Sequence, residues 1–155
     1  MTFEEVKRFL AARGLANQVH EFSESSATVE LAARAVGCEP CRIAKTMSFM
    51  VDGAPALIVL AGDTRVDNPK FKAQFHQKAV MLSPERVAEL TGFPVGGVCP
   101  FLAPQGVTVY LDESLKRFET VFPAAGSRNS AVEVSIPQLE DASAAAGWVD
   151  IGKQA

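Results

Sequence analysis

The pattern of hydrophobic and polar residues changes repeatedly between helical and strand spacing along the chain. A capping box of Thr2 and Glu5 begins the first predicted helix. Later helices begin at Thr28 and at Ser83-Pro84, where a side-chain cap or a proline in the first turn favours a helix start. The predicted helices lie between Thr2 and Gly14 and over residues 29–36, 68–75, 84–91 and 137–145, with a helical turn from Asp112 to Phe118.

Strand spacing recurs between these helices. Residues 43–51 continue through a turn at Asp52-Gly53 into residues 56–60, which predicts a β-hairpin. Because residues 56–60 are apolar on both faces, this strand is expected in the middle of a sheet. Further short strands are predicted at residues 19–22, 79–82, 107–111, 121–122 and 132–134.

This order of elements favours a mixed α+β protein of the broad α/β class. Several strands are neighbours in the sequence as hairpins, which excludes a purely parallel, doubly wound sheet. A curled mixed β-sheet flanked by helices fits the pattern. Neither a repeat nor a linker divides the chain, so residues 1–155 are expected to form a single domain.

Composition and charge exclude several function classes. The net charge of −3 argues against a broad surface for duplex nucleic acid, although a local contact to an RNA end stays open. The longest apolar stretch, residues 54–61, is too short to span a bilayer, so no membrane partner is expected. Acidic residues near the N-terminus and an odd count of three cysteines favour a cytoplasmic protein with reduced thiols.

Lys45 stands at an unusual position for a lysine. The period of two places it on one strand face with four large apolar residues, Ile43, Met47, Phe49 and Val51. A lysine there either extends its ammonium to water at the strand end or holds it in a cleft against an anionic or carbonyl partner. The first alternative is purely structural, whereas the second makes Lys45 a functional residue.

Two loops rich in small residues are further candidates. Residues 92–100 contain three glycines and two prolines, which favours a rigid loop that points successive N–H groups at one oxyanion, phosphate or carboxylate. Residues 123–130 carry hydroxyls, an amide and a guanidinium, which suits hydrogen bonding to a small polar ligand. Each loop can also be a plain connection, so composition alone leaves both alternatives open.

The cysteines give little support to a metal or a redox site. Cys38 and Cys41 have the right spacing, but a structural zinc needs four ligands, and Cys99, His20 and His76 are widely separated in sequence. Nothing in the sequence places a histidine beside Cys99 as a base. We therefore expect no metal and no cofactor.

Three motifs combine into a recognisable order: Ala44-Lys45-Thr46, the loop from Gly96 to Phe101, and Ala124-Ala125-Gly126-Ser127. With them the chain resembles, over residues 20–150, the YbaK and prolyl-tRNA-synthetase-associated domain family of free-standing trans-editing deacylases. The resemblance implies that family's fold and hydrolysis of the ester joining a wrong small amino acid, such as Ala, Cys, Ser or Thr, to tRNA. The implied partner is the aminoacylated 3′ end of a tRNA, and an aminoacyl-tRNA synthetase stays open as a second one.

The resemblance also implies which residues form the site. Two departures from the family pattern matter: Cys99 stands where many relatives have serine, and Leu102 where many have glycine. The first argues that this position need not be a hydroxyl nucleophile, and the second bears on the inner shape of the pocket. The implied catalytic residues are Lys45, Gly96, Gly97, Val98 and Cys99, and the implied substrate-binding residues are Thr46, Pro100, Phe101, Gly126, Ser127 and Asn129.

An aminoacyl ester is already activated, so an enzyme needs mainly to place water and stabilise the developing oxyanion. Backbone N–H groups of residues 96–99 are expected to bind the acyl oxygen, with Lys45 as a point charge. Two alternatives remain. A non-catalytic module that binds aminoacyl-tRNA, a nucleotide or a synthetase would show no turnover, and a thiol-disulfide protein using Cys38 and Cys41 would show a low thiol pKa.

Overall fold

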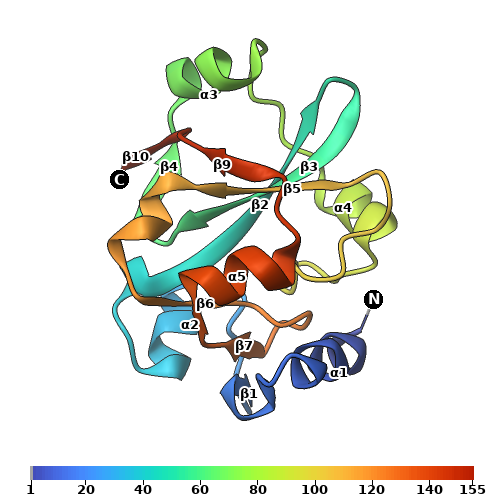
Figure 1. Ribbon diagram of the computed structural model, residues 1–155, viewed down its shortest axis with the longest axis vertical. Coiled ribbons are helices and arrows are strands. Elements are labelled where there is room, and N and C mark those ends of the chain that lie inside the picture. The colour runs from blue at the N-terminus through green and yellow to red at the C-terminus, as the bar shows by residue number, and fades with distance from the viewer. Residues whose placement is uncertain (1) are drawn as a thin grey trace.

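The computed structural model describes residues 2–155, and most of its α-helices begin at polar caps, while α2 and α4 end at glycines (Figure 1). The Thr2 hydroxyl accepts a hydrogen bond from Glu5 N at the start of the first helix. Thr28 caps the second helix through Leu31 N, and Gly37 ends it with φ of +84°. The α-helices are α1 (Phe3–Ala12), α2 (Val29–Val36), α3 (Asn68–Phe75), α4 (Pro84–Thr91) and α5 (Ile136–Ser143), and the 3-10 helices are η1 (Ala16–Gln18), η2 (Pro40–Arg42) and η3 (Glu113–Arg117).

The strands are β1 (Val19–Glu21), β2 (Ile43–Val51), β3 (Ala54–Ala61), β4 (Thr64–Val66), β5 (Thr108–Asp112), β6 (Thr120–Pro123), β7 (Ser130–Val132), β8 (Val134–Ser135), β9 (Gly147–Val149) and β10 (Gly152–Gln154). Within residues 2–155 the main sheet has six strands in the order β8-β6-β2-β3-β5-β9. β2 and β3 form the predicted antiparallel hairpin, whereas the β2–β6, β3–β5 and β5–β9 pairs are parallel. The predicted mixed sheet is therefore confirmed.

β3 lies in the middle of this sheet, as its apolar sequence predicts. Residues 57–61 are at most 1% exposed, because side chains pack against both faces of the strand. One face, with Val59, contacts a core cluster that includes Leu10 of α1 and Leu139 of α5. The other face, with Leu60, contacts Phe71 of α3 in a second cluster. The hairpin is thus the rigid centre on which neighbouring loops are placed.

The outer edge of β2 is paired at both ends and open in the middle. β6 pairs only with the first two residues of β2. The segment 80–82 takes over further along, where Leu82 N donates to Ser48 O at 3.2 Å. Between these contacts no strand pairs with residues 45–47 on this side, within the described part of the chain. The sheet therefore has a gap in its edge beside Lys45.

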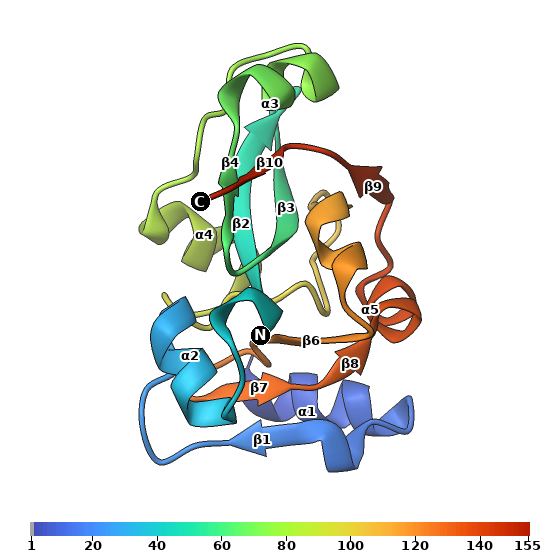
Figure 2. The ribbon, with the colours of Figure 1, turned by 90° about the vertical axis from the view of Figure 1, so that its left-hand side faces the viewer.

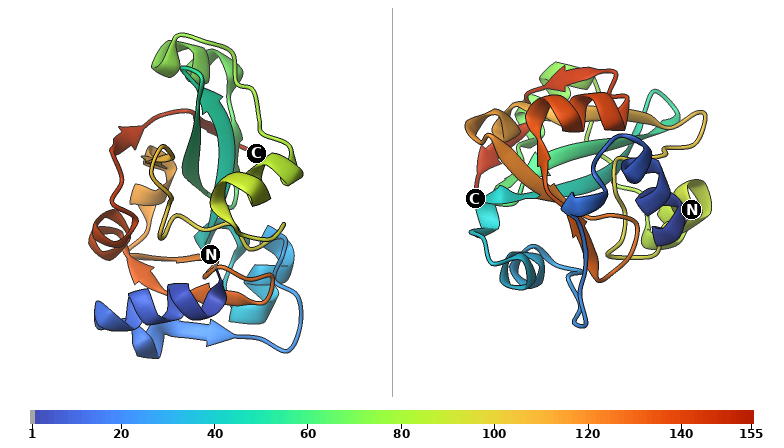
Figure 3. Two further views of the ribbon diagram at one scale, coloured as in Figure 1. Left: turned by 90° about the vertical axis from the view of Figure 1, so that its right-hand side faces the viewer. Right: turned by 60° about the horizontal axis from the view of Figure 1, so that its bottom comes forward.

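Helices flank this gap on the same side of β2. Figures 2 and 3 show α2 beside the start of the strand and α4 beside its later half. α3 lies at one end of the molecule, and α1 with β1 lies at the other (Figure 1). No helix within residues 2–155 combines the length and the apolar character needed to cross a membrane.

The structure corrects part of the strand prediction. Residues 79–82 make an isolated bridge, Met81 opposite Phe49, rather than a strand. The strand predicted at residues 132–134 is split at Glu133, because β7 pairs with β1 while β8 pairs with β6. The pattern does not predict β4, β9 or β10, because three residues are too few to show alternation.

Candidate active site

A cavity of about 240 Å³ lies where the edge of β2 opens. Its walls come from four parts of the chain: the start of α2, the first half of β2, the glycine-rich loop after α4, and the segment from β6 to β7. Of the residues singled out from the sequence, Lys45, Thr46, Gly96 and Val98 line it. Ala124, from the third sequence motif, lines it as well, so the fold brings parts of all three sequence motifs to one place.

Lys45 is half-buried in the cavity wall, and its ammonium makes no hydrogen bond or ion pair with any residue in 2–155. Burial lowers the pKa of Lys45, and this effect outweighs the nearby carboxylates of Asp63 and Glu30, which raise it. Asp63 is itself held by Arg117, whose Nη1 lies 3.0 Å from its Oδ2. A partly desolvated cation therefore faces the cavity without a protein partner.

Thr46 follows Lys45 and also lines the cavity. Its hydroxyl oxygen is buried and has no hydrogen-bond partner among the described residues. Buried polar atoms are almost always satisfied, and leaving one unpaired costs about 1–3 kcal/mol. The backbone edge of β2 is open at this residue as well. Thr46 therefore offers hydrogen-bonding groups that a ligand in the cavity can satisfy.

The glycine-rich loop contributes backbone rather than side chains. Gly97 N donates to Pro94 O at 2.9 Å, so this N–H group is already used in a turn. The N–H groups of Gly96, Val98 and Cys99 donate a hydrogen bond to no acceptor within residues 2–155. Gly96 and Val98 line the cavity, whereas Cys99 is fully buried and does not, so two of the four expected donors are available to a ligand oxygen.

The two glycines are required by packing against neighbouring loops. A Cβ on Gly96 would lie 2.6 Å from the Cβ of Ala27, and Gly96 has φ of +83°. A Cβ on Gly97 would lie 2.9 Å from the backbone of Ser127. These contacts press the loop against the start of α2 on one side and the loop before β7 on the other, which fixes the cavity wall.

Gly97→Ala should consequently lower stability before it affects chemistry. We expect a loss of about 1–3 kcal/mol in the free energy of unfolding, because the backbone of Ser127 cannot yield as a flexible side chain would. Gly147→Ala is the matched control, since a Cβ there meets nothing within 4 Å. Urea denaturation measures both variants. Unchanged stability of Gly97→Ala together with lost activity would show instead that this backbone touches the substrate.

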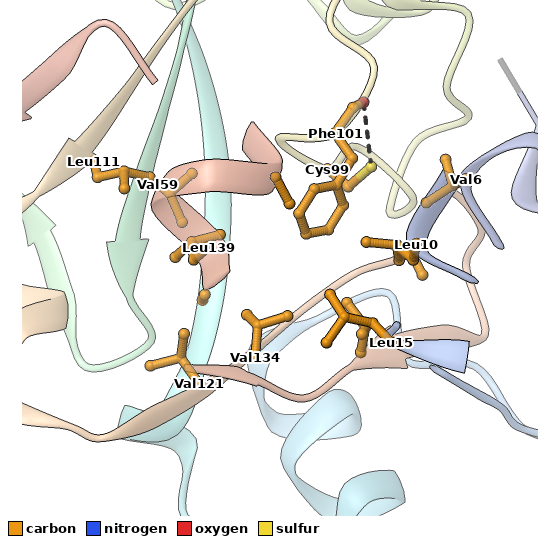
Figure 4. Close-up of a cluster of buried hydrophobic side chains, with 14 of the residues drawn as sticks. Val6, Leu10, Leu15, Val59, Cys99, Phe101, Leu111, Val121, Val134 and Leu139 are labelled. Atoms are coloured by element: carbon orange, nitrogen blue, oxygen red, sulfur yellow. Dashed lines mark hydrogen bonds between the residues drawn. The ribbon is translucent and has the colours of Figure 1, made fainter. Parts of the chain in front are cut away.

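The remaining motif residues of this loop lie in the core. Cys99 and Phe101 are 0% exposed, and Pro100 is buried. Figure 4 shows Cys99 among core side chains such as Leu10, with its thiol directed toward the Phe101 carbonyl oxygen at 3.9 Å. Burial raises the pKa of Cys99 to about 12. The thiol is therefore neither at the cavity nor ionised at neutral pH.

The second loop supports the site from behind. Gly126 packs against α1, where an added Cβ would lie 3.0 Å from a methyl group of Val6. Ser127 Oγ donates to Ser130 Oγ at 2.6 Å, and Asn129 Nδ2 donates to the backbone oxygen of Phe22 at 2.7 Å. Gly126, Ser127 and Asn129 do not line the cavity, whereas Ser130 does. The predicted residues Gly126, Ser127 and Asn129 thus fix the conformation of the loop, and Ser130 next to them lines the cavity.

Sequence reasoning also missed the wall formed by residues 26–28. Ser26 is buried, and its N–H donates to the Arg128 backbone oxygen at 2.6 Å, which ties this wall to the second loop. Ala27 and Thr28 continue it to the N-terminus of α2. The predicted helix cap at Thr28 was the one sequence feature that could have indicated this wall, because the N-terminus of a helix beside a glycine-rich loop often binds a ligand.

Residues 23–142 match the aminoacyl-tRNA editing domain. The chain belongs to this family. The matched range contains every residue of the cavity wall named above, whereas α1 lies outside it. The resemblance inferred from the three sequence motifs is therefore confirmed.

Individual relatives agree with this membership. The chain is 48% identical over 154 residues to the uncharacterized protein YwhH of Bacillus subtilis strain 168, covering 99% of this chain and 98% of that protein. It is 34% identical over 83 residues to a proline–tRNA ligase of Maridesulfovibrio salexigens, covering 53% of this chain and 14% of the ligase. A crystal structure described as a candidate trans-editing enzyme for prolyl-tRNA synthetase has a TM-score of 0.85 and 30% identity, covering 97% of this chain and 96% of that chain.

The chemistry available to this editing domain is electrostatic. The cavity wall holds a cation, backbone donors and hydroxyls, and neither His20 nor His76 lines it. Cys38 and Cys41 are half-buried free thiols outside the cavity, and burial raises the pKa of both. No group of three or more metal-ligating side chains occurs within residues 2–155. The site can thus stabilise negative charge, and it contains no nucleophile paired with a base.

Proposed function

We propose that this protein hydrolyses the ester bond between tRNA and a wrongly attached small amino acid. The observation that supports this proposal is Lys45, a half-buried cation without a protein partner at the wall of the cavity. A cation in such a place is costly unless a ligand carries the complementary charge. Family membership identifies the class of ligand, because the editing domain acts on aminoacyl-tRNA.

The cavity volume supports an ester at the end of a chain rather than a whole nucleotide. At about 240 Å³ it lies below the range of about 300–1,000 Å³ that is typical of pockets for drug-sized ligands. The last ribose, its phosphate and the ester group fit such a space, and the rest of the tRNA stays outside. This arrangement agrees with a net charge of −3, which does not favour a broad nucleic-acid surface.

In the proposed reaction, water attacks the acyl carbon, the ester C–O bond breaks, and the free amino acid and the tRNA hydroxyl are released. The N–H groups of Gly96 and Val98 stabilise the oxyanion that forms on the carbonyl oxygen. Lys45 holds the terminal phosphate or the carbonyl oxygen as a point charge. A neighbouring hydroxyl of the substrate's own ribose takes a proton from the water and passes its own proton to the departing ester oxygen, and Thr46 accepts a hydrogen bond from the α-amino group.

A panel of mischarged tRNAs tests this proposal against a pure binding module. tRNAs carrying Ala, Ser, Cys or Thr are incubated with the protein, and release of the free amino acid is followed under single-turnover conditions. We expect hydrolysis of at least one ester well above the chemical background. Tight binding of every charged tRNA without release would instead establish the non-catalytic module.

The rate should also depend on pH through Lys45. The protonated ammonium is the active form, and burial lowers its pKa below the usual value of 10.5. We therefore expect kcat/KM to be retained at neutral pH and to fall as pH rises through this lowered pKa. The measurement subtracts chemical hydrolysis at each pH, and Lys45→Met serves as the control because it should lack this alkaline limb. If kcat/KM of Lys45→Met fell over the same alkaline range, the titration would belong to another group.

Cysteine should be dispensable, because Cys99 is buried and water is the nucleophile. We expect a Cys38→Ser, Cys41→Ser, Cys99→Ala variant to keep its single-turnover rate within about tenfold, whereas loss of a covalent nucleophile costs several orders of magnitude. Alanine replaces Cys99 because serine would add a hydroxyl to the core. Complete loss in a variant whose fold is confirmed by circular dichroism would mean that a thiol attacks the ester.

A further inference from the structure

A second, more apolar groove of about 170 Å³ adjoins the cavity. It lies between α4 and the middle of β2, where Thr46 and Ser48 line it, and its side walls include Leu82, Val87 and Phe93. Its outer lips are Met81 and Val95, which are 57% and 59% exposed. Large apolar side chains with that much exposure usually mark a binding surface when they cluster.

The groove and the cavity are continuous. They share three lining residues, Thr46, Gly96 and Val98. These are the residue with the unpartnered hydroxyl and the two loop residues with unengaged N–H groups. The reacting ester is therefore expected at the junction between the two spaces, with one part of the substrate on each side.

The two spaces differ in chemistry in the same way as the two ends of an aminoacyl ester. The cavity has Lys45, Ser26, Thr28 and Ser130 in its walls, which suits a ribose and a phosphate. The groove carries no charged residue in its wall and contains mainly aliphatic and aromatic side chains. Such a wall favours an apolar amino-acid side chain over the ribose and the phosphate.

We propose that the groove binds the side chain of the mischarged amino acid and selects aliphatic chains longer than the methyl group of alanine. This inference rests on the proposed deacylase function and names its substrate class. A cavity of about 150 Å³ can hold a benzene molecule, so a groove of about 170 Å³ holds a chain of three or four carbons. A methyl group would leave most of it unfilled. The polar side chains of the groove, those of Thr46 and Ser48, both lie on β2, so a serine hydroxyl finds partners only there and leaves the apolar remainder unfilled.

The experiment compares four esters on one tRNA: alanyl, seryl, 2-aminobutyryl and norvalyl. We expect kcat/KM to rise along alanyl, 2-aminobutyryl and norvalyl by ~10-fold or more per methylene, the usual lower value for a hydrophobic pocket. The seryl ester should be hydrolysed no faster than the alanyl ester.

Leu82→Phe tests the location of the side chain by narrowing the groove from a half-buried wall position. It should reduce norvalyl hydrolysis ~10-fold and change alanyl hydrolysis less than twofold, which reverses part of the wild-type preference. Leu90→Phe is the matched control, because Leu90 is half-buried in α4 and does not line the groove. It should alter neither ester.

The outcomes separate this inference from the proposed function. Hydrolysis that needs Lys45 but is fastest with the alanyl or seryl ester would overturn the inference and leave the deacylase intact. An equal loss on all esters in Leu82→Phe, with the fold confirmed by thermal denaturation, would overturn it as well. Absence of any Lys45-dependent hydrolysis across the four esters would overturn both.

Discussion

Lys45→Met is expected to slow single-turnover hydrolysis of a mischarged tRNA by ~10² to 10³-fold while the protein remains folded. Loss of one preorganised electrostatic contact to a developing charge typically has this effect. Methionine keeps the apolar stem of the lysine within the β2 wall and removes only the ammonium. Because burial lowers the pKa of Lys45, its charge destabilises the folded state at neutral pH, so the melting temperature should stay the same or rise.

The matched control is Lys72→Met. Lys72 is exposed on α3, away from the cavity, and makes no ion pair within residues 2–155. It should leave the rate unchanged, which separates the local role of Lys45 from a general effect of lysine charge on tRNA binding. Full turnover by a folded Lys45→Met protein would remove Lys45 from the mechanism and leave the site without its cation.

Helix boundaries were predictable because local chemistry fixes them. Thr28 and Gly37 satisfy the terminal backbone groups of α2 from within the same segment, so the sequence is sufficient to place both ends. The β2–β3 hairpin was predictable for a similar reason, since its turn residues and its apolar pattern agree. β9 and β10 depend on partners far away in sequence, and short strands of that kind carry no pattern of their own.

The candidate site, too, has features that the local sequence reveals and features that only tertiary packing determines. Lys45 was identifiable because a charge on an apolar strand face conflicts with the local pattern, and such conflicts often mark function. The loop was identifiable from its glycine and proline content, but the close approach of its glycines to Ala27 and Ser127 is set by tertiary packing. Sequence spacing could not show that Cys99 turns into the core while its neighbour Val98 faces the cavity.

The loop is held rigidly, and its residues alternate between lining the cavity and packing against the rest of the protein. Gly96 and Val98 contribute to the cavity wall, whereas Gly97, Cys99 and Phe101 fix the loop to the body of the protein. Preorganised donors stabilise an oxyanion only when their positions do not relax during the reaction. In the proposed mechanism, the buried side chains therefore support the function by fixing the loop, without contact to the substrate.

Phe101→Ala tests this division most severely. The Phe101 ring is fully buried, and its centroid lies 6.5 Å from that of Phe9 on α1. Truncation of a buried phenylalanine to alanine usually lowers the free energy of unfolding by about 3–5 kcal/mol, through lost transfer energy and the cavity left behind. We expect a loss of that size by urea denaturation, and Phe101→Leu should retain most of the stability because it keeps the site filled.

Activity per folded molecule distinguishes an anchor from a substrate contact. Phe101→Leu should hydrolyse a mischarged tRNA within a fewfold of the wild-type rate, because the leucine still holds the loop from inside the core. Phe101→Ala should lose activity in proportion to the fraction unfolded, together with any loosening of the loop. If both variants were as stable as the wild type and both lost hydrolysis, the ring would be a substrate contact, as the family resemblance implied. The burial of the ring in the core with Leu10 and Leu139 makes the first result the expected one.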